Sequence, residues 1–280
     1  MKTTKRSEKF LIDMACQIFE TSAKEADCIS YTSKILVSTS LPCRNLNIGE
    51  FSRNNGHTRF TIHAPIEIGI PYGTYPRLLL IWIVTEAKKH KTREIYLGET
   101  VTEFIRNIGK AGSGGKTGSL TALREQAKRL FTSTITTTCN KKNTTSIRNL
   151  SFAKDASIIW KPNSKSNWSS TLTLSESFYE DISQSAIPID MRVVQACSHY
   201  PLAIDIYCWL TYRNFGLKRP TVITWQQLAS QFGNTYSEQR HFKHKFLKAL
   251  YRVHLFYPDA KFMELSRGLC LYPSPTHIPK

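Results

Sequence analysis

The segment 222–253 constrains this chain more than any other stretch, because it joins two helical patterns through a tight turn. Thr224 and Gln227 predict a capping box at the start of the first helix, since each side chain can bond the backbone of the other residue. Gly233 and Asn234 predict the end of that helix, because both residue types readily adopt positive φ. The segment therefore predicts a helix-turn-helix.

The second helix of this segment has one apolar face and one basic face. It is expected to begin with Ser237 as its N-cap. Its apolar residues recur at steps of three and four: Phe242, Phe246, Ala249, Leu250 and Val253. Its other faces contain the basic side chains Arg240, His241, Lys243, His244, Lys245, Lys248 and Arg252. This arrangement is typical of a recognition helix that enters DNA, and the segment alone leaves a solvated basic surface helix equally open.

The charge balance of the whole chain favours a polyanionic partner. The 280 residues include 38 Lys and Arg against 21 Asp and Glu, which gives a formal net charge of +17. Such a field attracts nucleic acid or an anionic membrane surface. A membrane partner is not expected, because the longest apolar run, Leu78–Val84, is far shorter than the roughly 20 residues that a spanning helix needs. Acidic residues interrupt the apolar residues of the N-terminal segment, so we expect no secretory signal and a cytoplasmic protein.

The sequence predicts no catalytic, metal or cofactor site. The seven cysteines form no CxxC or CxxH pair, so we expect reduced thiols and no zinc site. Gly115-Lys116-Thr117 resembles the end of a P-loop, but Lys110 stands where the motif requires its first glycine. No H-x-H pair is present to hold the metal of a nicking enzyme, and no HExxH or GxSxG motif occurs. We therefore expect a protein that is not an enzyme.

A second helix-turn-helix pattern is present in residues 74–160. We expect a helix that begins with Thr74 as its cap, a helix over 99–108, a polar turn over 110–118 and a helix over 119–131. A β-hairpin with a basic tip at 140–143 follows and would serve as the wing. Residues 188–273 show the same succession of patterns, and both units have an excess of Lys and Arg over Asp and Glu.

These patterns predict an α+β protein with two tandem winged-helix domains. The expected divisions are an N-terminal helix with a mobile connection over 1–45, a first winged-helix domain over 46–175 and a second over 176–280. An Asn-Gly signal at 54–56 predicts a further hairpin near the start of the first domain. The candidate DNA contacts of the first domain are Lys116, Thr117, Ser119, Thr121, Arg124, Lys128 and Arg129. Those of the second domain are Ser237 and the basic side chains of its second helix.

Two blocks of sequence resemble the plasmid replication initiators of the RepA type. The first consists of IPYGTYPRLLLIWIVTEA, TREIYLGETVTEFIRNIG and LTALREQAKRLFTSTI, and the second contains IPIDMRVVQACSHYPLAIDIYCWLTYR, ITWQQLASQFG and FKHKFLKALYRV. The blocks occur in the order found in that family and cover roughly residues 58–275. Residues 1–45 have no counterpart in the resemblance.

The resemblance implies a function that periodicity and charge do not reveal. It implies binding of double-stranded DNA at repeated sites (iterons) in a plasmid origin, opening of a nearby A·T-rich segment, and recruitment of a host initiator and the replicative helicase. Some such initiators also form homodimers that repress their own gene. A transcriptional repressor without initiator activity is the alternative, since it would use the same helices. A nicking or ATP-using replication enzyme is a third hypothesis, and the incomplete motifs argue against it.

Overall fold

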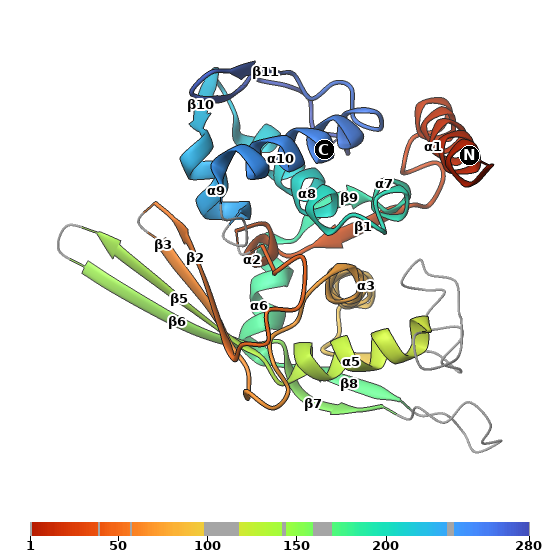
Figure 1. Cartoon of the computed structure of the whole chain (residues 1–280). Helices are drawn as coiled ribbons and strands as arrows, with labels where there is room; N and C mark the ends of the chain where they lie inside the picture. Colours follow the sequence, from red (N-terminus) through yellow and green to blue (C-terminus); the bar gives the residue numbers. More distant parts are fainter. Residues whose placement is uncertain are drawn as a thin grey trace.

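The computed structural model describes residues 2–38, 40–56, 58–97, 118–141, 144–158, 170–233 and 238–279 (Figure 1). The helix expected over 99–108 and the turn over 110–118 lie outside or almost entirely outside these ranges. Helices and strands are mixed along the chain, so the predicted α+β class is confirmed.

The elements follow one another without long runs of a single type. The first part contains α1 (Lys2–Glu20), β1 (Ile29–Thr32), α2 (Lys34–Ser38), β2 (Glu50–Asn55) and β3 (Thr58–His63). The middle part contains α3 (Thr74–His90), β4 (Glu94–Tyr96), α5 (Ser119–Phe131), β5 (Thr134–Lys141), β6 (Thr144–Ser151), β7 (Ala153–Ser157) and β8 (Thr171–Leu174). The last part contains α6 (Glu176–Ser185), β9 (Ile187–Asp190), α7 (Met191–Ala196), α8 (Pro201–Gly216), β10 (Thr221–Thr224), α9 (Trp225–Phe232), α10 (Gln239–His254), β11 (Phe262–Leu265) and β12 (Gly268–Leu271).

Two small sheets share one strand order. One sheet has the order β4-β8-β7 and the other has the order β10-β12-β11, with every pairing antiparallel. In each sheet, the short strand that follows a long helix pairs with the last strand of the unit. The first unit therefore consists of α3, β4, α5, β7 and β8, and the second consists of α8, β10, α9, α10, β11 and β12.

The hairpin expected with its tip at 140–143 is formed by β5 and β6, but it does not close the first unit as expected. It belongs to a separate four-stranded sheet of order β2-β3-β5-β6 (Figure 1). Ile62 of β3 lies opposite Ile135 of β5, which lies opposite Leu150 of β6, and all three are buried. This apolar row joins the hairpin to the predicted β2–β3 hairpin, because alternating side chains must share one buried face. Strands β7 and β8 take the place that we expected for β5 and β6.

The mobile connection expected within residues 1–45 is wrong for residues 29–32 and 34–38, which form β1 and α2. Strand β1 pairs with β9, so that Ile29 lies opposite Asp190. Val37 and Leu41 are buried in the core. This pairing joins the N-terminal segment to the start of the second unit, and the sequence contains no local signal for it. The division into three domains remains a prediction.

Two of the expected helix caps are also wrong. The N-cap of α3 is Gly73, at φ 76° and without a side-chain cap, so Thr74 is the first helical residue. The N-cap of α10 is Glu238, and Ser237 lies outside the described residues. The capping box of Thr224 and Gln227 is confirmed, because the side chain of each residue accepts a hydrogen bond from the backbone of the other.

Gly233 ends α9 for a reason other than the expected positive φ. Its φ is −115°, which any residue can adopt. A Cβ atom at this position would lie 2.5 Å from Cδ2 of Phe242. Phe242 is buried, so the glycine is required by close packing between the end of α9 and α10.

A buried ion pair joins the two units. Nε and Nη2 of Arg77 on α3 lie 2.7 and 2.6 Å from the two carboxylate oxygens of Asp205 on α8. The same guanidinium donates to the carbonyls of Leu41 and Gly73, and the Ser40 hydroxyl donates to Asp205. Both charged side chains are almost entirely buried. The segment between α2 and β2 is therefore held at the junction of α3 and α8.

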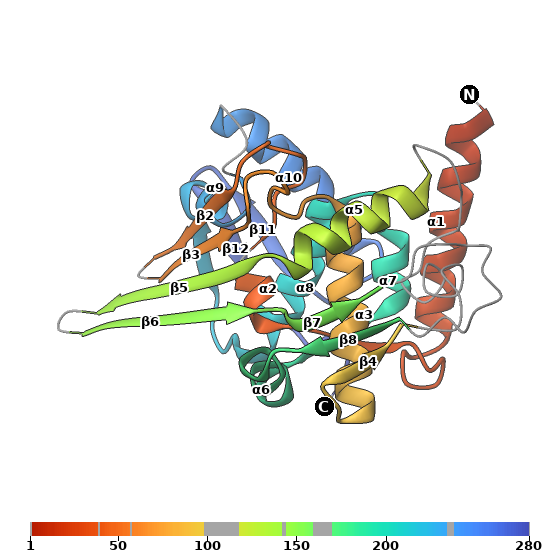
Figure 2. The same ribbon diagram turned by 90° about the horizontal axis from the view of Figure 1, so that it is seen from below.

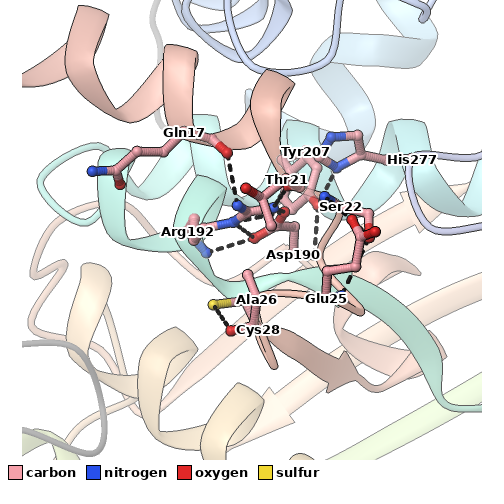
Figure 3. Close-up of polar contacts among 10 residues, drawn as sticks. All are labelled: Gln17, Thr21, Ser22, Glu25, Ala26, Cys28, Asp190, Arg192, Tyr207 and His277. Carbon is pink, nitrogen blue, oxygen red and sulfur yellow. Dashed lines mark hydrogen bonds and ion pairs between the residues drawn. The ribbon is translucent and has the colours of Figure 1, made fainter.

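A second polar cluster holds the two ends of the chain against the body (Figure 3). The guanidinium of Arg192 makes a bidentate contact with Asp190 and donates to the carbonyls of Gln17 and Thr21, around the C-terminal end of α1. The Tyr207 hydroxyl accepts from the backbone N–H of Asp190 and lies 2.8 Å from Nδ1 of His277 in the C-terminal segment. Burial lowers the pKa of His277 and raises that of Tyr207. This hydrogen bond ties the C-terminal segment to α8.

We expect Asp205→Asn to lower the free energy of unfolding by about 3 kcal/mol or more, because it leaves the buried guanidinium of Arg77 without its counter-ion. Chemical denaturation would measure this loss. Glu86→Gln is the matched control, since Glu86 forms an exposed pair with His90 on the same helix as Arg77 and should contribute about 0.5 kcal/mol or less. Equal losses in the two variants would contradict the central role of the junction.

We expect Gly233→Ala to lower the free energy of unfolding by about 1–3 kcal/mol, because the added methyl group overlaps the ring of Phe242. Gly216→Ala at the end of α8 is the control. A Cβ atom there meets nothing within 4 Å, so the change should be neutral or slightly stabilising. Thermal unfolding of both variants would test the difference, and a neutral Gly233→Ala would show that the turn can move away from the ring.

Candidate nucleic-acid interface

One face of α10 is buried on an aromatic platform. Phe242, Phe246, Leu250 and Val253 are buried, as the helical spacing predicts. The ring of Phe246 packs against Phe232, Trp209 and Trp225 with centroid separations of 5.5, 6.4 and 6.3 Å. These rings come from α9, α8 and the start of α9, so α10 contacts both preceding helices. The orientation of α10 about its own axis is therefore fixed.

The opposite face of α10 is basic and exposed. Its exposed side chains are Arg240, His241, His244, Lys245 and Lys248. Glu238 lies 3.7 Å from Arg240 and 4.0 Å from His241 at the first turn. Within the described part of the chain, no carboxylate forms an ion pair with His244, Lys245 or Lys248. The middle of α10 therefore presents uncompensated positive charge to solvent.

Two basic residues of α10 are held by neighbouring side chains at the margin of this face. Nζ of Lys243 lies 2.8 Å from Oε1 of Glu264 on β11 and 4.9 Å from the centroid of the Trp225 ring. The guanidinium of Arg252 lies 3.8 Å from the centroid of Tyr200. A phosphate that contacted Lys243 would compete with the carboxylate of Glu264 for its ammonium group. Both residues were predicted as DNA contacts, and the structure gives them packing roles as well.

Helix α5 also buries one face and exposes polar and basic groups on the other. Leu123, Ala127 and Leu130 are buried against α3. Thr121, Arg124 and Lys128 are exposed, and Ser119 is half-buried. The predicted contacts Lys116 and Thr117 lie outside the described residues. The part of α5 that can meet a ligand is therefore smaller and less basic than that of α10.

Arg129 is not available for the contact that the sequence predicted. Its guanidinium lies 2.7 Å from Oε1 of Glu125, donates to the carbonyl of Ile70 and lies 5.2 Å from the centroid of Tyr72. Only 11% of its side chain is exposed. Arg129 joins α5 to the segment before α3, so it is removed from the candidate contacts.

Helix α10 and the N-terminal end of α5 lie toward one side of the molecule. Figure 2 shows α10 and the N-terminal end of α5 along the upper side, while the C-terminal end of α3 lies toward the lower side. The ion pair between Arg77 and Asp205 fixes α3 against α8. Helix α5 packs against α3, and α10 packs against α8. The spacing between the two exposed faces is therefore a property of the folded chain.

The pattern analysis missed a contribution from the β11–β12 hairpin. A hollow of about 510 Å³ lies between the N-terminal ends of α9 and α10 and this hairpin. Its lining includes Gln226, Gln239, Arg240 and Arg267. Arg267 is exposed at the hairpin turn, and its side chain makes no ion pair in the described part of the chain. Only its position beside Arg240 indicates a binding role for Arg267.

Other classes of site receive no support from the described residues. They contain no group of three or more His, Cys, Asp or Glu side chains that could hold a metal ion. No described helix is both long and apolar enough to cross a bilayer. All seven cysteines are described as free thiols. The exposed basic faces of α10 and α5 are the candidate interface.

Comparison with known folds gives two crystal structures of domains 2 and 3 of RctB. One has a TM-score of 0.53 and 13% sequence identity, covering 85% of this chain and 94% of that structure. The other, a selenomethionine derivative, has a TM-score of 0.55 and 12% identity, covering 86% and 96%. At such low identity the likeness concerns the fold. A search of the curated proteins finds no match.

Comparison with protein families identifies the chain itself. The model of plasmid-encoded RepA proteins matches residues 70–227, which is more than half of the chain. The match extends from the start of the first unit into α9, so α10 and the β11–β12 hairpin lie beyond it. The resemblance inferred from the two sequence blocks is thereby confirmed. The chain belongs to the family of plasmid-encoded RepA proteins.

Proposed function

We propose that this protein initiates replication of a plasmid by binding duplex DNA at repeated sites in the origin. Family membership supports the plasmid role. The observation that carries the DNA-binding part is the exposed basic face of α10, whose charges are uncompensated along the middle of the helix. A helix with its apolar side packed and its cationic side free fits the major groove of B-DNA.

We infer that each unit is a winged-helix domain. The second unit has the succession helix, strand, helix, helix and hairpin, and its sheet has the order β10-β12-β11. The first unit has the same strand order in β4-β8-β7. In this reading α10 and α5 are the two recognition helices, and the β11–β12 hairpin is the wing beside α10. Arg267 at its turn would then contact the backbone next to the groove.

The residues of α10 divide into two roles in this proposal. Arg240 stands at the N-terminal end of the helix, where recognition helices contact base edges, and its guanidinium can form a bidentate pair with guanine. Lys245 and Lys248 lie further along and would neutralise phosphates, releasing counter-ions. On α5, Arg124 and Lys128 would do the same in a neighbouring groove. No step in this scheme requires catalysis by the protein.

Binding by two rigidly joined helices suits a site that spans more than one groove. The Arg77–Asp205 pair holds α3 against α8 before DNA binds. The binding free energies of the contacts by α5 and α10 can therefore add, because little entropy is lost in ordering the two units relative to each other. Opening of the origin, recruitment of host replication proteins and dimerisation are also part of the proposal. Only membership of the family supports them. A repressor without initiator activity would use the same surface.

We expect Lys248→Ala to weaken binding to all DNA sequences and to lower the slope of log affinity against log salt by about one. Arg240→Ala should instead relax the preference at one base position at a cost of about 1–3 kcal/mol. Gel-shift binding to the DNA flanking the gene, against random competitor at two salt concentrations, would measure both effects. Lys89→Ala, the same change at the far end of α3, is the control and should leave affinity unchanged (Figure 2).

Equal losses on specific and random DNA for Lys248→Ala and Arg240→Ala would contradict this division of roles. Uniform and steeply salt-sensitive binding by the unchanged protein would contradict specific recognition altogether.

Plasmid maintenance separates the initiator from the repressor. We expect a plasmid that carries the candidate origin to replicate in a host only when this protein is supplied, and to be lost with Lys248→Ala because origin binding is weakened. Transformation efficiency and plasmid copy number would measure this. Repression of a reporter gene without any maintenance of the plasmid would identify the protein as a repressor.

A further inference from the structure

A polar groove lies between the second unit and the β2–β3 hairpin, beside β10. It has a volume of about 450 Å³, and its walls come from α2, α8, α9, β10 and the end of the β2–β3 hairpin. Figure 1 shows β10 above the end of this hairpin and α9 beside it. Trp209 and Tyr212 supply an aromatic part of the wall, while Asn54, Gln226 and Ser230 supply amide and hydroxyl groups. Neither the fold nor the proposed contacts with DNA use this groove.

One wall of the groove is a strand that has a neighbour on one side. Among the described strands, β10 pairs with β12 alone, and residues 221–223 of β10 line the groove. All four side chains of β10 are half-buried, so the strand is neither covered by the core nor fully solvated. An edge strand of this kind offers backbone N–H and C=O groups that an extended chain can pair with.

The groove also contains a cationic group with an unused donor. Nε of Arg213 on α8 is buried, and it has no hydrogen-bond partner among the described residues. A buried donor without a partner is costly, so a ligand that supplies an acceptor gains from meeting it. None of the described side chains that line the groove is Asp or Glu. Lys218 and Arg219, both exposed, precede β10 and add positive charge nearby.

We propose that this groove binds an extended, acidic segment of a partner protein. The segment would pair with the free edge of β10 and place a carboxylate against the guanidinium of Arg213. The amide and hydroxyl groups of Asn54, Gln226 and Ser230 would bond its remaining polar groups. A single guanidinium beside a strand edge suits one acidic side chain of a peptide, whereas a nucleic-acid backbone needs a row of cations. A partner bound here touches the second unit and the four-stranded sheet, since Asn54 belongs to β2.

Fluorescence anisotropy with labelled seven-residue peptides tests this inference on the full chain. The first peptide alternates Thr and Val around a central Glu, and the second has Gln in place of that Glu. We expect the Glu peptide to bind about tenfold more tightly than the Gln peptide, because a charge-assisted bond to Arg213 is lost. A third peptide with a central Pro should bind more weakly than the Glu peptide, because proline cannot join a strand ladder.

Two variants test whether the peptide binds in this groove. Arg213→Gln should remove the difference between the Glu and Gln peptides, as a double-mutant cycle requires. Ser230→Glu places a carboxylate in the same groove and should weaken binding of the Glu peptide even if Arg213→Gln folds poorly. Lys248→Ala should leave peptide binding unchanged. Arg213→Gln should leave DNA binding unchanged, so failure of this inference and failure of the DNA-binding proposal are distinguishable.

Several outcomes would overturn the inference. Absence of binding by the Glu peptide, or equal affinity for the Glu and Gln peptides, would remove the role of Arg213. Equal affinity for the Pro peptide would exclude pairing with β10. Displacement of the peptide by millimolar inorganic phosphate would mark a site for small anions, and displacement by oligothymidine would mark a nucleic-acid surface.

Discussion

The arrangement of the two units depends on the buried contact between Arg77 and Asp205. A guanidinium and a carboxylate removed from water are favourable only when nearly every donor and acceptor has a partner. Here the carbonyls of Leu41 and Gly73 and the hydroxyl of Ser40 supply those partners. Since the partners come from the segment between α2 and β2 as well as from α3 and α8, the pair orders three parts of the chain at once.

The candidate interface follows from this rigidity and from the aromatic platform beneath α10. Phe246 contacts Trp209, Trp225 and Phe232, so a rotation of α10 about its axis would break several ring contacts together. The basic face is held outward for the same reason. Specific reading of base edges requires side chains whose starting points are fixed, because a mobile helix would lose entropy on binding. The platform supplies that fixed starting point.

Local features of the fold were predictable because they depend on neighbours a few residues apart. The capping box of Thr224 and Gln227, the two faces of α10 and the hairpin at 54–56 follow from bonds and contacts within a turn or a hairpin. By contrast, the sequence did not predict that β1 pairs with β9 or that β5 pairs with β3. They bring together residues far apart in the chain, and short strands have patterns that fit several partners.

In the candidate site, too, the sequence predicts the local pattern of charge but not which charged side chains are buried or paired. The sequence by itself determined that the chain is strongly basic and that one helix has a cationic face, since composition and a period of 3.6 residues require no knowledge of distant contacts. Only the tertiary structure decided which cations face solvent. Arg77 is bound by a carboxylate from another helix, and Arg129 and Arg192 donate to backbone carbonyls from distant segments, whereas Lys245 and Lys248 remain free of ion pairs among the described residues. Basic residues alike in sequence differ in this way because burial and the partners that compensate it are set largely by contacts between distant segments.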